Sequence, residues 1–135
     1  MRNYMKKTKY IPALLILLIG SLFLNIFLYQ SHKNEQQLYQ RNLNQRLSSE
    51  LTFFASQLEE GKIPNTSLLN SASIIDTLSY YSDMKISFNL AFLIQEKIGN
   101  DQTLKNTDKV KETIISIQEA PTQEEILKLG ILLKQ

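Results

Sequence analysis

The chain has 135 residues, enough for one membrane span and one small domain, and it contains no cysteine. Disulfides, thiolate metal sites and cysteine nucleophiles are therefore excluded. The formal net charge is +2, but four of the 15 basic residues precede residue 11, which leaves 11 basic against 13 acidic residues in the rest of the chain and disfavours a nucleic-acid-binding surface.

Residues 1–10 form a short basic tail, in which the charges are Arg2, Lys6, Lys7 and Lys9. Residues 11–29 follow without a charged side chain, and about 20 apolar residues in a helix cross the hydrocarbon core of a bilayer. This run is longer than the apolar core of a cleavable signal peptide, and bulky Leu28 and Tyr29 stand where a peptidase needs small residues. The segment is therefore predicted to be an uncleaved transmembrane signal anchor.

The distribution of basic residues predicts the orientation of this span. Four basic residues precede it, whereas Lys33 is the only Lys or Arg among the ten residues that follow Tyr29. Because basic residues accumulate on the cytoplasmic side of a membrane span, we expect a cytoplasmic N-terminus and an extracytoplasmic C-terminal domain.

Two polar residues interrupt the span. Ser21 and Asn25 are four positions apart and share one face of the expected helix. Each could bond within its own helix. Alternatively, the pair could form a helix–helix contact, worth about 0.6–2 kcal/mol per hydrogen bond.

A second helical pattern covers residues 30–60. Its first part is polar and could continue the membrane helix as a solvated stalk. Apolar residues then recur at spacings of 4, 4, 3 and 4, which predicts one apolar stripe on a helix. The stripe consists of Leu43, Leu47, Leu51, Phe54 and Leu58. Together with Ser21 and Asn25 these are the candidate interaction residues, and Gly61 and Pro64 should end the helix.

The remaining chain also has helical patterns. Asn65 to Ser67 can cap a region that runs to Ile98, as one kinked helix or as two helices with Asp83 capping the second. This region could pair with residues 30–60 as an antiparallel hairpin. After a loop at 101–108, helices are expected from Thr107 or Asp108 to Glu119 and, after Pro121, behind a Thr122–Glu125 capping box. The last helix is apolar around most of its circumference and should be buried against the rest of the chain or against a partner.

No catalytic or ligand-binding motif stands out. His32 is the only histidine, so a metal site would lack further imidazole or thiolate ligands. Ser82 and Lys85 match a Ser-x-x-Lys pattern without its companion motifs, and a cap is the simpler interpretation. Tyr80 and Tyr81, with Phe53, Phe54, Phe88 and Phe92, are expected in the core, or else as an exposed anchor for a partner. No cofactor, metal or small-molecule substrate is indicated.

The sequence thus predicts an all-α protein in which one N-terminal transmembrane helix precedes a small extracytoplasmic helical domain at 30–135, built from a helical hairpin and one or two shorter C-terminal helices. From Ser31 onward 39 of 105 residues are apolar, a low share that predicts a thin core completed by a protein partner or by self-association.

The layout resembles bitopic bacterial envelope proteins of division or sporulation assemblies. A non-catalytic interaction or scaffold protein is expected; the alternative is a phage- or toxin-type membrane-acting protein.

Overall fold

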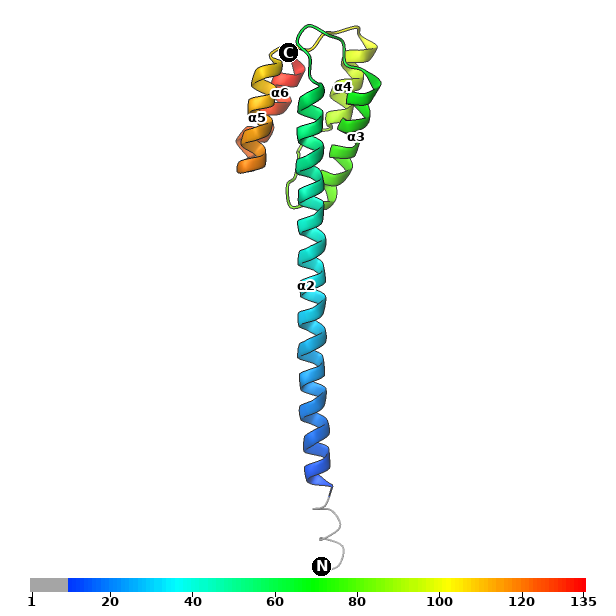
Figure 1. Ribbon diagram of the computed structural model, residues 1–135, viewed down its shortest axis with the longest axis vertical. Coiled ribbons are helices and arrows are strands. Elements are labelled where there is room, and N and C mark those ends of the chain that lie inside the picture. The colour runs from blue at the N-terminus through cyan, green and yellow to red at the C-terminus, as the bar shows by residue number, and fades with distance from the viewer. Residues whose placement is uncertain (1–9) are drawn as a thin grey trace, which may run out of the picture. The chain divides into compact units, whose positions relative to one another are not determined.

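A computed structural model describes residues 10–135, and within them the chain forms five α-helices and no strand, as predicted (Figure 1). The basic residues of the tail lie outside the described residues. The chain divides into two compact units, residues 1–39 and a C-terminal domain of residues 40–135. The helices are α2 (Ile11–Gln57), α3 (Thr66–Tyr81), α4 (Leu90–Gly99), α5 (Thr107–Glu119) and α6 (Gln123–Lys134).

The helix α2 is continuous for 47 residues, so the prediction that the polar stalk continues the apolar helix is confirmed. Pro12 is tolerated because it lies in the first turn, where its missing N–H has no partner in the helix. The helix ends at Gln57, a few residues before the predicted stop. Gly61 then adopts the left-handed conformation, with a φ of 73°, that a residue with a Cβ rarely takes.

The core of the C-terminal domain contains side chains from the last part of α2 and from all four shorter helices. Helix α3 packs against α4, and α6 packs against both α5 and α4. Successive helices of the domain alternate in direction (Figure 1). The stripe of α2 supplies part of this core, because Leu47, Leu51 and Phe54 are completely buried. Burial of the predicted stripe is therefore confirmed.

The region from 66 to 98 contains two helices, which resolves the alternative that the sequence left open. Serine hydroxyls fix the chain between α3 and α4. The Ser79 and Ser82 hydroxyls donate to the Met84 carbonyl at 3.0 and 2.9 Å, and Ser79 Oγ accepts from Ile86 N at 2.6 Å. The prediction that Asp83 caps the second helix is wrong. Asn89 caps α4 instead, and its side chain accepts from Phe92 N at 2.7 Å.

The predicted caps at the other helix starts have mixed outcomes. Asn65 Oδ1 accepts from Leu68 N at 2.9 Å, and Thr122 Oγ1 accepts from Glu125 N at 3.2 Å, so both of these caps are confirmed. Helix α5 differs from the prediction, because neither Thr107 nor Asp108 is its N-cap. The N-cap is Asn106 in a left-handed conformation, and its side chain makes no capping bond.

The last helix is buried on one side only. Ile126, Leu129 and Leu133 belong to the core, whereas Leu127 and Ile131 are exposed. Gly130 allows the helix to approach the aromatic ring of Phe88, since a Cβ at this position would lie 3.1 Å from Phe88 Cδ1. Burial against the rest of the chain is therefore confirmed for one face of α6, and burial of the other face against a partner stays a prediction.

We expect Phe54→Ala to destabilise the domain by about 3–5 kcal/mol, because it removes a fully buried ring and leaves a cavity. The neighbouring Phe53, which is 52% exposed, provides a matched control, and Phe53→Ala should change stability by much less. Denaturant unfolding of the full chain in detergent micelles, followed by circular dichroism, measures both. Equal effects of the two substitutions would contradict the packing described here.

Candidate functional site

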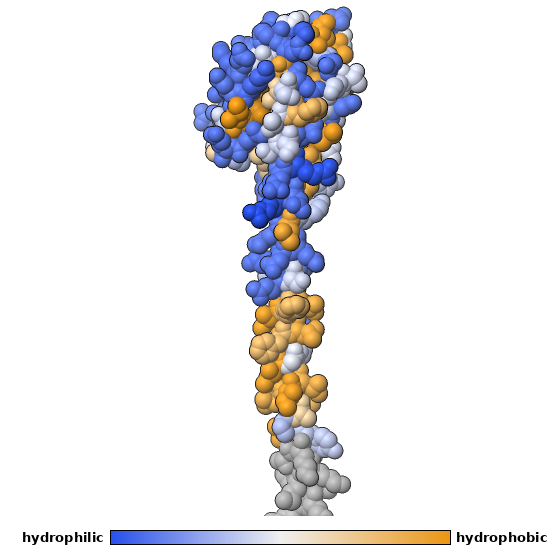
Figure 2. All heavy atoms as spheres, in the orientation of Figure 1, coloured by the Kyte–Doolittle hydropathy of each residue, from blue (hydrophilic) through white to orange (hydrophobic). Residues whose placement is uncertain are grey.

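The segment 11–29 of α2 presents apolar side chains that are exposed in the part of the chain that the structure describes. Every residue of this segment is exposed, and the 18-residue window most suited to crossing a membrane is 0% buried (Figure 2). A core helix of a soluble protein would be largely buried. Among the described residues, α2 is the one helix long and apolar enough to span a membrane. Its surface therefore requires lipid or another apolar partner.

Ser21 and Asn25 lie in this segment on exposed positions. Within residues 10–135 neither side chain makes a hydrogen bond to another part of the chain. An amide transferred into an apolar medium without a partner costs several kcal/mol. The contacts of a single copy therefore do not distinguish a bond within the helix from a bond to a second helix. A helix–helix contact stays a prediction.

The five other candidate interaction residues are core residues of the chain itself. Leu47, Leu51 and Phe54 are fully buried, while Leu43 and Leu58 are buried at the ends of the stripe. All except Leu43 belong to one cluster with apolar side chains of the other helices of the C-terminal domain. A second protein could reach this stripe only if the domain opened.

The aromatic residues do not form the predicted core cluster. Phe54 alone among them is fully buried, and Phe88 is packed against the edge of the core. The other four, Phe53, Tyr80, Tyr81 and Phe92, are exposed. Tyr80 and Tyr81 contact each other edge to face with ring centroids 5.0 Å apart. The expectation of burial is confirmed for Phe54 and is wrong for these four residues. On α3 and α4 the faces that meet the core are filled by aliphatic side chains.

A shallow hollow of about 650 Å³ lies beside the segment between α3 and α4, and Asp76 is its one acidic residue. Both carboxylate oxygens of Asp76 are occupied, because Leu90 N and Ala91 N donate to them at 2.9 and 2.8 Å. Desolvation by burial raises the pKa of Asp76, and these two hydrogen bonds oppose the rise. Asp76 thus holds the first turn of α4 in place, and its contacts are those of a helix cap.

The Ser-x-x-Lys pattern does not form a nucleophile and its base. The Ser82 hydroxyl donates to the Met84 carbonyl, and Lys85 Nζ donates to the carbonyl of Tyr80. Lys85 Nζ also lies 5.8 Å from the centroid of the Tyr80 ring. Ser82 is the C-cap of α3. These contacts agree with the structural interpretation of the pattern.

Glu60 provides a second cap that the sequence pattern did not reveal. One carboxylate oxygen accepts from Thr107 N and Thr107 Oγ1, both at 2.8 Å, and the other accepts from Asn106 N at 3.1 Å. The bonds from Thr107, its backbone N–H first, lower the pKa of Glu60. A carboxylate at this position also complements the dipole of α5. No local spacing signal could have identified this contact, because 47 residues separate Glu60 from Thr107.

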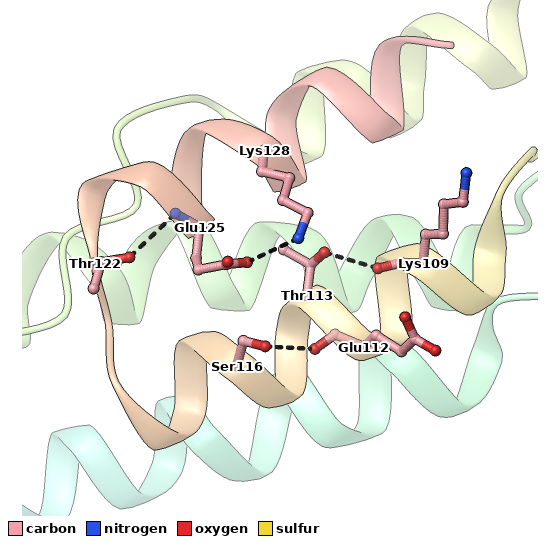
Figure 3. A network of polar contacts seen from close by, with 7 residues as sticks. All are labelled: Lys109, Glu112, Thr113, Ser116, Thr122, Glu125 and Lys128. Atoms are coloured by element: carbon pink, nitrogen blue, oxygen red, sulfur yellow. Dashed lines mark hydrogen bonds and ion pairs between the residues drawn. The ribbon is translucent and has the colours of Figure 1, made fainter.

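Polar contacts on α5 and α6 are otherwise local. Figure 3 shows Thr113 and Ser116 bonding to backbone carbonyls of their own helix and Lys128 Nζ 3.5 Å from Glu125 Oε2. Gln118 is an exception, since its amide nitrogen lies 2.7 Å from the carbonyl oxygen of Ser48 and ties α5 to α2. Across residues 10–135, no group of three or more His, Asp or Glu side chains could hold a metal ion.

Comparisons of the chain with protein family models, with curated proteins and with solved structures found no match. Two features of the structure therefore bear on function. These are an uncovered apolar helix with two polar residues, and a helical domain whose polar contacts stabilise its own fold.

We expect Glu60→Gln to lower the melting temperature of the domain at neutral pH. The pKa of Glu60 in the fold is below the ordinary 4.5 of a glutamate, so its stabilisation is complete above about pH 4.5 and is lost as the pH falls through the lowered value. The difference between wild type and variant should therefore shrink in acid. Thermal unfolding of the full chain between pH 7 and pH 3 measures this difference.

Glu59→Gln is the matched control, because Glu59 makes only an exposed ion pair with Lys62. Such pairs contribute little to stability, so this variant should melt close to wild type at every pH. A pH-independent difference at Glu60 would mean that its carboxylate charge does not stabilise α5.

Proposed function

We propose that the chain is a single-pass, membrane-anchored interaction or scaffold protein of the bacterial cell envelope, without catalytic activity. In this proposal the N-terminus is cytoplasmic and the C-terminal domain is extracytoplasmic. The observation that carries it is the complete exposure of an uncharged helical segment that is long enough to cross a bilayer. The four basic residues before that segment support the orientation.

The contacts of the C-terminal domain support an interaction role over a catalytic one. Asp76 and Glu60 have shifted pKa values, but each accepts hydrogen bonds from the start of a helix. The Ser82 hydroxyl and the Lys85 ammonium group are directed to separate carbonyls. These side chains thus have structural tasks. What the domain presents to a partner is its exposed surface, which includes Tyr80 and Phe92.

A phage- or toxin-type membrane-acting protein, the alternative function, would require α2 itself to permeabilise the membrane. A span that permeabilises a membrane has to line an aqueous path with polar side chains, and Ser21 and Asn25 are the only polar side chains within residues 11–28. Expression in a bacterial host with a potential-sensitive dye separates the two functions. A scaffold leaves the membrane potential unchanged, whereas a membrane-acting protein collapses it.

The topology can be tested with a reporter fused after Gln135. We expect a reporter that works only outside the cytoplasm, such as a periplasmic phosphatase, to be active and a cytoplasm-only fluorescent reporter to be dark. Replacing Lys6, Lys7 and Lys9 with Gln should shift part of the population to the opposite orientation, because the charge bias that fixes the N-terminus is reduced.

Lys105, Lys109 and Lys111 provide the matched control, since their replacement with Gln removes the same number of charges from the C-terminal domain. Residues this far from a span contribute little to its orientation, so this variant should keep the wild-type reporter pattern. A C-terminal fusion that works only in the cytoplasm would overturn the proposed orientation.

A further inference from the structure

We propose that two copies of the chain associate in parallel through one face of α2. This face, called here the polar face, is formed by Ser21, Asn25, His32, Gln36 and Tyr39. The inference rests on the membrane anchoring proposed above and names the partner as a second copy of the same chain.

Helix geometry brings the five residues to one side. Each residue of an α-helix turns by about 100°, so the five side chains lie within about 60° of one another around the axis. All five positions belong to one continuous helix and are exposed. The structure shows His32 and Gln36 as direct neighbours, with their Nε2 atoms 3.3 Å apart. Leu28 fills the position on this side between Asn25 and His32.

Asn25 provides the chemical reason for association. Its amide has a donor and an acceptor, and the side chains around it in the span are apolar. In hydrocarbon such a group gains most by bonding to a polar group on another helix. Ser21, one turn away on the same face, adds a small side chain that lets two backbones approach closely.

A second copy suits this face for reasons of symmetry and charge. Anchoring with one orientation makes all copies parallel, so the face of one copy meets the same residues of the other. An Asn amide is self-complementary, because the oxygen of one copy accepts from the nitrogen of the other. The only charged residues between Tyr10 and Gln40 are Lys33 and Glu35. Lys33 points about 100° away from His32, whereas Glu35 precedes Tyr39 by one helical turn and lies about 40° from it, at the flank of the polar face. The five positions of the face itself therefore carry no Lys, Arg, Asp or Glu.

The polar stretch of the face also benefits from a partner. Residues 32–39 are exposed on all sides of α2, and a short polar helix is marginal in water without packing. Tyr39 and Leu38 are both more than half exposed, but only Tyr39 belongs to the polar face. Pairing would cover the Tyr39 ring and leave Leu38 at the outside.

The chain has no cysteine, so single-cysteine variants report on proximity without background. We would reconstitute Gln36→Cys and Gln37→Cys as full chains in phosphatidylethanolamine–phosphatidylglycerol vesicles and oxidise them mildly. The two variants replace the same residue type at neighbouring exposed positions about 100° apart. Gln36→Cys should form disulfide-linked dimers readily, and Gln37→Cys should form few.

A second measurement leaves the polar face intact. Energy transfer between chains labelled after Gln135 is followed as lipid is added to dilute the protein. Asn25→Leu should weaken association by roughly 3- to 30-fold, whereas Phe23→Leu, a substitution on the opposite side of the span, should have little effect.

Equal cross-linking at positions 36 and 37 would overturn the proposal, and so would unchanged association of Asn25→Leu. A chain that remains monomeric while its C-terminal reporter is extracytoplasmic would also overturn the pairing, yet it would leave the proposed anchoring intact. If the proposed anchoring is wrong, a reporter that works only outside the cytoplasm will be inactive when fused after Gln135. That result is separate from the measurement of association.

Discussion

The apolar surface of α2 between Ile11 and Tyr29 is the constraint on which the rest of the structure depends. No side chain of residues 10–135 buries it, so its burial requires lipid or another apolar partner. A helix satisfies its own backbone hydrogen bonds, and this is why it can enter lipid without further contacts. The segment therefore contributes nothing to the core of the C-terminal domain, which has to be built from the residues that follow.

The C-terminal domain forms its core from few apolar residues, and two caps whose partners are distant in sequence help to hold it together. Its core joins the stripe of α2 to four short helices, and short helices expose a large proportion of unpaired N–H groups at their starts. Asp76 accepts from the first N–H groups of α4, and Glu60 accepts from those at the start of α5. Each carboxylate thus orders the start of a short helix and fixes that helix to a distant part of the chain.

The sequence could predict an interaction only where its two partners lie close together in the chain. The burial of Leu47 and Phe54 was predictable because helical periodicity is a local pattern. The caps at Asn65 and Thr122 were predictable because the N–H group that each side chain binds lies three residues away. The Glu60 cap was not predictable, since its partners come from another loop. The sequence left burial and exposure of Tyr80 and Phe92 as alternatives, because the type of a side chain does not show which face of a helix meets the core when aliphatic residues compete for the same space.

The burial of the stripe also changes where an interaction can take place. The sequence alone makes the leucines of α2 and the polar residues of its span equally good candidates for contacting a partner. Leu47 and Leu51 now have partners within their own domain, and exposing them to a second protein would cost about as much as their removal from the core. Within residues 10–135 Asn25 is exposed and its side chain contacts no core side chain, and lipid cannot provide a hydrogen-bond partner. Association therefore stabilises the span more than any other part of α2, because it can provide the Asn25 amide with a hydrogen-bond partner. A second copy can be that partner, because two Asn amides can bond to each other.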